Sequence, residues 1–314
     1  MSKIIGEGIT FDDKLTLGFK LLAGIWGEGV RKEDIDALTG TGGDWFSRYE
    51  YLISDFQTML NTMITGYYFQ YISEWKTNLR KLTSDAVALN FAVVAYRKWE
   101  KHGRPSGNTT AAKAFRKECL ILWDRMIYEY IMGKWKGSGD SKINNNIEQT
   151  KNGNYPLEVS AQDWINLLNE ILSNQSVGGI PIKSQSSMEP ILYHFYCLKK
   201  LTIPAEAQSF EVDHIMPKEA LTTAGYEAKK QHSLYNLALL PKKDNCAKSN
   251  KKLNQITDGW LIRMITEYEF IPRRDFDRYS DMGNLERLLK QRFKTFEEVF
   301  KVDGIRAQRI RNPE

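Results

Sequence analysis

The sequence has few cysteines, and they lie far apart. Three occur in 314 residues, at Cys119, Cys197 and Cys246, and no two of them form a CxxC pair. Disulfide frameworks and structural zinc ribbons need cysteines in suitable pairs, so neither is expected here. We interpret the three residues as free thiols.

Long apolar runs are also missing. No stretch approaches the ~20 consecutive apolar residues that a membrane-spanning helix requires. The N-terminal sequence MSKIIGEGITFDDK lacks the order of a secretory signal, in which basic residues precede an apolar run. No internal repeat or low-complexity tract is present. The sequence therefore predicts a cytoplasmic protein without a membrane partner.

The composition is that of a folded protein. Hydrophobic residues make up 42%, aromatic residues 12% and charged residues 26%, which argues against extensive disorder. A chain of this length can bury a sizeable core without a metal or a disulfide. The net charge of +5 permits a polyanionic partner without requiring one.

Apolar residues recur at helical spacing through most of the N-terminal half. A helix is predicted over residues 84–103, because Ser84 is a suitable N-cap and Gly103 a suitable stop. A second helix is predicted over residues 110–135. Residues 136–156 are rich in glycine and asparagine, which favours a linker.

Two further helices are predicted beyond that segment. Ser160 and Asp163 form a capping box at the start of the first, and Pro190 stands in the first turn of the second. The hydrophobic period then changes. FEVDHI (residues 210–215) alternates and NLALL (residues 236–240) is a short apolar run, so both are predicted strands.

A lysine-rich segment follows the second strand and is predicted to be helical, which gives a ββα unit. We expect a mainly α-helical protein that carries this small unit. The expected segments are a helical domain over 1–150, a helical connector over 151–205, the ββα unit over 206–256, and C-terminal helices over 257–314 that pack on it.

The ββα segment contains residues suited to phosphodiester hydrolysis, which needs an activated water and positive charge on the phosphate. Asp213 and Asn245 offer oxygen ligands, which suit Mg²⁺ better than zinc. His214, with an ordinary pKa near ~6.5, remains free to act as the general base. Asn236 is the candidate to hold that base in one orientation.

Lysines are concentrated beside these residues. Residues 242–252 carry a net charge of +4, against +5 for the whole chain. Such a segment can contact backbone phosphates without reading sequence. The lysines are Lys242, Lys243, Lys248, Lys251 and Lys252. Lys248 lies three residues after Asn245, on the same helical face, and could approach the scissile phosphate.

One geometric difficulty accompanies this site. Successive strand residues point to opposite faces, yet Asp213 and His214 should reach the same phosphate. The sequence therefore predicts a twisted or bulged strand end. Because the stretch from His214 to Asn236 is long for a structureless loop, a short helix is expected within 218–232.

The motifs DHIMP, YNLALL and DNCAKSN resemble the DH, N and N elements of the HNH, or ββα-metal, nuclease family. They match its HNN variant, which is also found in the HNH domain of RNA-guided CRISPR effectors. The helical context resembles the C-terminal nuclease half of GmrSD-type and SspE-type phage-defence restriction proteins. The resemblance covers 45 of 314 residues.

This resemblance implies a one-metal DNA endonuclease that uses Mg²⁺, with Mn²⁺ as a substitute, and that serves restriction of foreign DNA. It implies that His214 is the base, that Asp213 and Asn245 bind the metal, and that Asn236 supports the loop. The implied products have 5′-phosphate and 3′-hydroxyl ends. A single site cuts one strand, so nicking is the expected activity.

Two departures from the family pattern stand out. The ParB-like nucleotide-binding half of those defence proteins, with its DGQQR-like motif, is not present, and neither are the two CxxC pairs of many HNH proteins. We therefore expect the nuclease half alone. Besides DNA, its expected partner is a nucleotide-binding sensor, either as an N-terminal domain or as a separate protein.

Other interpretations remain open. The chain could be a non-catalytic nucleic-acid-binding module or a partner-docking scaffold with a degenerate HNH motif, and its nucleic acid could be RNA. His232 could be an alternative ligand or base, although a loop histidine that faces solvent is favoured. His194 and Cys197, at i, i+3 spacing, favour a buried helix face over a thiol nucleophile with its base.

Overall fold

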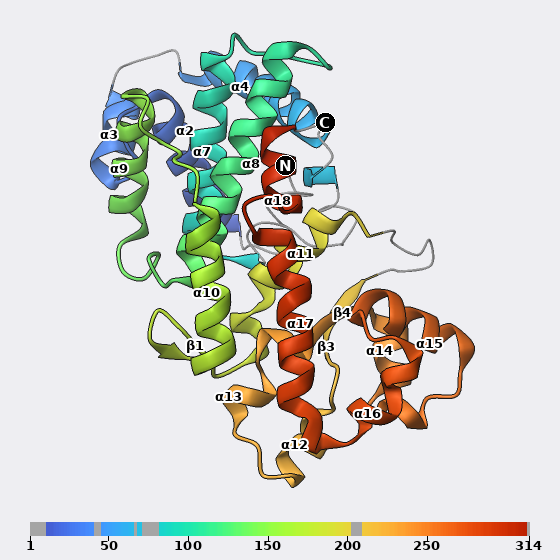
Figure 1. The fold of residues 1–314 in the computed structure, drawn as a ribbon. Helices are drawn as coiled ribbons and strands as arrows, with labels where there is room; N and C mark the ends of the chain where they lie inside the picture. The colour runs from blue at the N-terminus through green and yellow to red at the C-terminus, as the bar shows by residue number, and fades with distance from the viewer. Residues whose placement is uncertain (1–10, 41–44, 66–67, 71–81, 202–208, 313–314) are drawn as a thin grey trace. The chain divides into compact units, whose positions relative to one another are not determined.

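The computed structural model describes residues 11–40, 45–65, 68–70, 82–201 and 209–312. This part of the chain is mainly helical and contains two small antiparallel sheets of two strands each (Figure 1). The expected mainly α-helical class is confirmed. The N-terminal segment and the predicted start of the ββα unit at residues 206–208 lie outside the described residues. None of the described helices combines the length and apolarity needed to cross a bilayer.

The described residues divide into two compact units. The first extends to Val159 and includes the residues from Arg309 onward, and the second contains Ser160–Gln308. The first helical domain is predicted to end at residue 150, and a connector is predicted over 151–205. In the structure, the described residues of that connector from Ser160 onward belong to the second unit.

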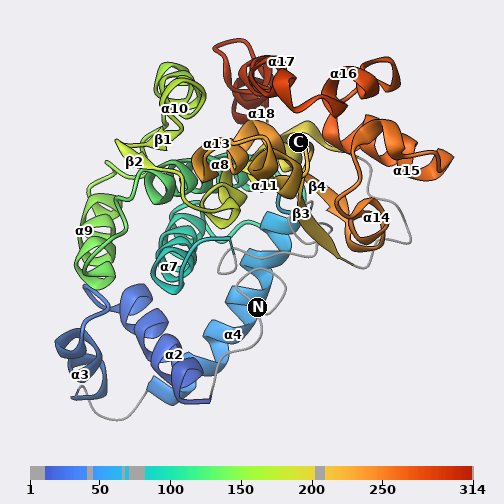
Figure 2. The same cartoon turned by 90° about the horizontal axis from the view of Figure 1, so that it is seen from below.

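The first unit is built around a buried helix, α7. Its helices are α2 (Phe11–Trp26), α3 (Lys32–Gly40), α4 (Trp45–Ile64), α7 (Asp85–Lys101), α8 (Thr110–Ile131) and α9 (Gly139–Lys151). α7 contacts α2, α4, α8 and α9, and Figure 2 shows it between α4 and α9. The Ser84 side chain caps α7 by accepting a hydrogen bond from the Val87 backbone N–H, as the sequence predicts.

The predicted linker over 136–156 is wrong, because α9 occupies most of it. Its composition is polar, but Ile143 and Ile147 lie one turn apart and are fully buried. The Asn146 side chain donates a hydrogen bond to the Asn90 side chain of α7 over 3.0 Å. Buried apolar side chains on one face, together with this amide pair, thus pack the asparagine-rich segment as a helix.

The second unit contains both sheets and the predicted ββα segment. Its first elements are α10 (Ala161–Asn174), β1 (Ser176–Val177), β2 (Ile180–Pro181), η1 (Gln185–Ser187), α11 (Glu189–Lys199), β3 (Phe210–His214), α12 (Lys218–Thr223), α13 (Ala228–Gln231) and η2 (Leu234–Asn236). They are followed by β4 (Leu237–Pro241), α14 (Lys242–Lys248), η3 (Leu253–Gln255), α15 (Gly259–Met264), the π-helical turn η4 (Ile265–Glu269), η5 (Arg273–Asp275), α16 (Phe276–Ser280), η6 (Met282–Asn284) and α17 (Leu285–Phe300). The last helix, α18 (Ile305–Arg311), contains the boundary between the two units, which follows Gln308.

Packing in the second unit surrounds the β3–β4 pair. The pair contacts α14, while β4 also contacts α11 and η4. Of the C-terminal elements, α15 contacts α14, and α17 contacts α10, α11 and η2. The short helices α12 and α13 confirm the expectation of helical structure between the two strands.

Side chains of α10, α11 and α17 form an aromatic core in this unit. His194 and Cys197 are both buried in α11, as expected. The His194 ring lies 5.7 Å from Trp164 and 5.8 Å from Phe300, centroid to centroid. These surroundings are apolar and aromatic, so the His194 and Cys197 pair belongs to the core.

Candidate functional site

The two strands of the predicted site pair in a regular antiparallel ladder. Asp213 lies opposite Ala238 and His214 opposite Leu237, and every residue of β3 has a partner in β4. Of the predicted twisted or bulged strand end, the bulge is therefore wrong. Because side chains alternate along a regular strand, Asp213 and His214 point to opposite faces. Asp213 meets α14, whereas the His214 ring meets the loop after α13.

The His214 ring is paired with a second histidine. Its Nε2 lies 3.1 Å from Nδ1 of His232, so a single proton is shared between these nitrogens. Burial lowers the pKa of His214 to about 4, and the nearby Asp213 carboxylate opposes this shift. The imidazole is therefore neutral at pH 7.

His232 is not the solvent-facing loop histidine that the sequence favours. Its exposed fraction is 7%, and burial is the main cause that lowers its pKa. The residue ends α13 as its C-cap, which turns the ring toward β3. The sequence carries no signal for this contact, because it depends on how α13 folds back over the strand.

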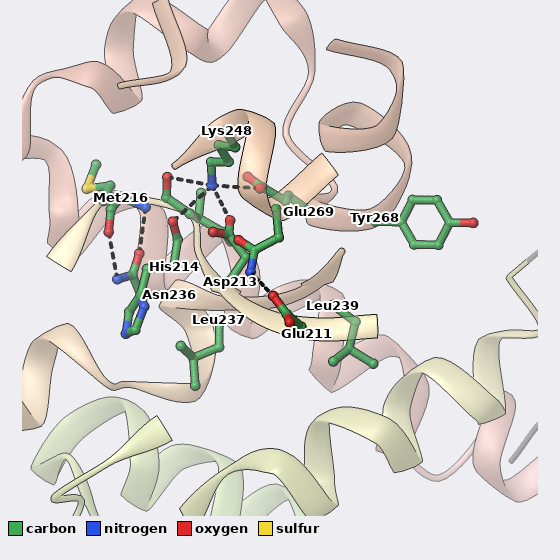
Figure 3. A network of polar contacts seen from close by, with 12 residues as sticks. Glu211, Asp213, His214, Met216, Asn236, Leu237, Leu239, Lys248, Tyr268 and Glu269 are labelled. Carbon is green, nitrogen blue, oxygen red and sulfur yellow. Dashed lines mark hydrogen bonds and ion pairs between the residues drawn. The ribbon is translucent and has the colours of Figure 1, made fainter. Parts of the chain in front are cut away.

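Asn236 forms hydrogen bonds with the backbone that follows His214. It is fully buried, and its side-chain carbonyl accepts a hydrogen bond from the Met216 backbone N–H over 2.9 Å. Its amide nitrogen donates to the Met216 and Gln231 carbonyls over 3.2 and 3.0 Å, and its backbone carbonyl accepts from Ile215. Through these hydrogen bonds, Asn236 links the chain before β4 to the chain after β3 and to the end of α13 (Figure 3).

Lys248 does not lie where a phosphate contact requires it. Its side chain is fully buried and its ammonium pairs with Asp213 and with Glu269, the latter over 2.7 Å. It also donates to the His214 carbonyl over 2.9 Å. Burial alone would lower the pKa of Lys248, but the two carboxylates outweigh it and the pKa is raised. Lys248 was expected to approach DNA, but it belongs to a buried ionic cluster. The reason is that the α14 face that bears Lys248 packs on β3 (Figure 3).

Glu269 is a site residue that the sequence analysis misses. It ends the π-helical turn η4 and is fully buried. Burial raises its pKa to about 8; the Lys248 charge opposes this effect and the Asp213 charge adds to it. Within the described chain, Glu269 Oε2 is enclosed and has no hydrogen-bond partner. The sequence suggests only a regular amphipathic helix here, and a π turn is not visible in that pattern.

Side chains of two other helices donate hydrogen bonds to the backbone of the π turn. Arg292 of α17, fully buried, donates to the Glu269 and Leu237 carbonyls over 2.8 Å each. The Tyr196 hydroxyl of α11 donates to the Tyr268 carbonyl. Glu269 is therefore held beside Asp213 by residues that lie far apart in the sequence, namely Tyr196 and Arg292.

Asn245 lies on the same side of β3 as Asp213. Its amide nitrogen donates to Glu211 over 3.0 Å, which leaves its carbonyl oxygen as the atom that could bind a cation. Glu211 stands two residues before Asp213, and this i, i+2 spacing is a sequence signal that could have added it to the site. The Lys242 ammonium nitrogen lies 3.6 Å from Oε1 of Glu211.

The remaining lysines of the basic segment stay near the surface. Lys242, Lys243 and Lys251 are exposed and Lys252 is half-buried. Lys251 donates to the Ala247 carbonyl over 3.0 Å. Without Lys248, four of the five predicted lysines can still face a phosphate backbone.

The donor atoms suit a hard divalent cation by their chemistry. Asp213 and Asn245 supply a carboxylate and an amide oxygen, and the enclosed Oε2 of Glu269 is a further oxygen without a hydrogen-bond partner. Mg²⁺ favours oxygen donors and needs few from the protein. Lys248 already neutralises Asp213, however. Across the described residues, no group of three or more histidine, cysteine, aspartate or glutamate side chains is placed to hold a metal.

Comparisons with protein-family models, with curated proteins and with solved structures found no match to this chain.

Proposed function

We propose that this chain is an HNH-type phosphodiester hydrolase that nicks DNA and serves restriction of foreign DNA. The observation that carries the proposal is the ββα arrangement itself. β3 pairs with β4, and β4 runs directly into α14. Asp213 and His214 stand at the end of β3 on opposite faces, Asn236 directly precedes β4, and Asn245 lies on α14. A phosphate would have to be bound at the end of β3 to meet both Asp213 and His214.

His214 supports this proposal as the general base. A neutral imidazole can accept a proton at pH 7, and burial keeps His214 neutral. When its Nε2 proton is donated to His232, the lone pair of His214 is on Nδ1, and this atom would take the proton of the attacking water. His232 then acts as a positioning residue that fixes the ring and its tautomer.

Asp213 and Asn245 are the proposed ligands of Mg²⁺, with Mn²⁺ as a substitute. When bound, the ion supplies positive charge that stabilises the phosphate in the transition state. Glu211 orients the Asn245 amide, and Asn236 holds the backbone after His214. The exposed lysines Lys242, Lys243 and Lys251 and the half-buried Lys252 are the proposed contacts to DNA phosphates.

Supercoiled plasmid DNA provides the direct test. We expect nicked circles with Mg²⁺ or Mn²⁺ and no cutting in EDTA, with binding that weakens steeply as salt rises. Cutting that proceeds equally in EDTA would contradict the metal assignment.

The ion pair between Lys248 and Asp213 favours a second candidate, a nucleic-acid-binding module whose HNH motif is degenerate. In that case Lys248 has replaced the metal as the cation beside Asp213. DNA binding without any nicking in Mg²⁺ or Mn²⁺ would support this candidate and exclude the nuclease.

Protein stability should reflect the lowered pKa of His214. That pKa is about 4 in the folded protein and near ~6.5 in an unfolded chain. As pH falls, the unfolded chain therefore binds the proton first, and stability is lost between about pH 6.5 and about pH 4. Urea unfolding in EDTA across this range should show a smaller decline for His214→Gln than for the wild type. An identical decline in both proteins would contradict the buried, neutral imidazole.

A further inference from the structure

Trp260 is exposed at the edge of the proposed site. It stands in the first turn of α15, and 46% of its surface is accessible. Among the described residues of the second unit, it is the one tryptophan, tyrosine or phenylalanine that is exposed rather than buried or half-buried. An exposed aromatic ring gains hydrophobic free energy when a flat apolar partner covers it, so Trp260 offers a surface for such a contact.

The ring is fixed in this exposed position by contacts to neighbouring side chains. Its Nε1 donates a hydrogen bond over 3.1 Å to Asp244, which is 6% exposed. Asp244 belongs to α14 and directly precedes the proposed metal ligand Asn245. The Arg263 guanidinium lies over the ring, 5.8 Å from its centroid. Trp260 is therefore anchored to the helix that carries the site, with much of its surface free.

The charges around Trp260 favour an uncharged, flat occupant beside an anionic backbone. Lys242 and Lys243 are exposed at the start of α14, which contacts α15, and they can meet phosphates. Close to the ring acidic side chains outnumber the single cation, because Arg263 is accompanied by Asp244, by Asp258, the N-cap of α15, and by Glu267, so a phosphate is disfavoured there. A nucleobase is flat and neutral and is joined to phosphates, so it matches both regions.

We propose that Trp260 stacks an unpaired base of the DNA substrate beside α14, with Lys242 and Lys243 on the adjoining phosphates. This inference rests on the proposed function and adds a substrate preference to it. The protein binds DNA that has at least one unpaired base near the cleavage position, such as a single strand, a gap or a flipped base.

Binding in EDTA tests the inference apart from cleavage. The full-length protein is titrated into a fluorescein-labelled single-stranded oligonucleotide, and fluorescence anisotropy gives Kd. The free energy of stacking one base on an aromatic ring predicts that Trp260→Ala weakens single-strand binding by about tenfold. Trp260→Phe keeps an aromatic ring and should weaken binding less. Tyr51→Ala is the matched control, because Tyr51 is a 75% exposed aromatic of the first unit, and its Kd should equal that of the wild type.

The salt dependence separates stacking from charge. Trp260→Ala should leave the slope of log Kd against log salt unchanged, whereas Lys243→Ala should reduce it by about 0.7 for a single strand. Equal single-strand affinity of Trp260→Ala and the wild type would overturn the inference while leaving the proposed function intact. A wild type that binds neither single-stranded nor duplex DNA would overturn both. Tighter binding of RNA of the same sequence would overturn the assignment to DNA.

Discussion

Replacement of His214 with alanine is expected to abolish nearly all nicking of supercoiled DNA. A positioned general base contributes about 10²- to 10⁴-fold to the rate, and the His214 ring is the neutral imidazole at the end of β3. The loss should fall on kcat, with little change in KM, because the base acts in the transition state. Nicking rates measured over a range of DNA concentrations separate the two constants.

His102→Ala is the control for removal of an imidazole elsewhere. His102 caps the end of α7 in the first unit and pairs with Glu118 over 3.3 Å, so this variant should nick at the wild-type rate. His232→Ala should reduce kcat by less than His214→Ala, because it removes only the group that orients the base. If His214→Ala retained wild-type nicking, the assignment of the base would be wrong.

Replacement of Lys248 with methionine is expected to destabilise the fold strongly. The fully buried ammonium stands between Asp213 and Glu269, and its removal leaves the buried Asp213 carboxylate without a counter-charge and Glu269 without its hydrogen-bond donor. Removal of one partner from a buried ion pair costs about 3–5 kcal/mol. The free energy of unfolding in urea, compared with that of the wild type, measures the loss.

Two further variants test the cause of this loss. Lys243→Met, on the exposed side of the same helix, should change the free energy of unfolding by less than about 0.5 kcal/mol. Addition of Asp213→Asn to Lys248→Met should recover part of the lost stability, because it removes the uncompensated charge. If Lys248→Met and Lys243→Met were equally stable, the buried cluster would have no structural role.

Much of the helical framework follows from local sequence. Ser84 and Ser160 are N-caps as predicted, because a cap depends on backbone groups within three residues of it. The alternation of FEVDHI and the short run NLALL likewise predict β3 and β4. The segment 136–156 shows where composition misleads, since α9 is fixed by the burial of a few side chains and not by its many asparagines.

The site was predictable only in part. Asn236 and Asn245 are found in the ββα context that their motifs suggest, directly before β4 and on α14. Lys248 lies at the spacing expected for α14, but its helical face packs inward on β3 and so cannot present it to DNA. The strand end proved regular, so that Asp213 and His214 point to opposite faces.

The sequence by itself determined the helical class, the position of the strand pair and the residues able to carry out the proposed chemistry, because periodicity, caps and motifs involve neighbours along the chain. The tertiary structure alone decided which charges meet. Lys248 with Glu269, and His214 with His232, are brought together only when the second unit folds. Burial there raises the pKa of Glu269 and lowers that of His214, because the loss of water disfavours a charged side chain, and no local pattern encodes that loss.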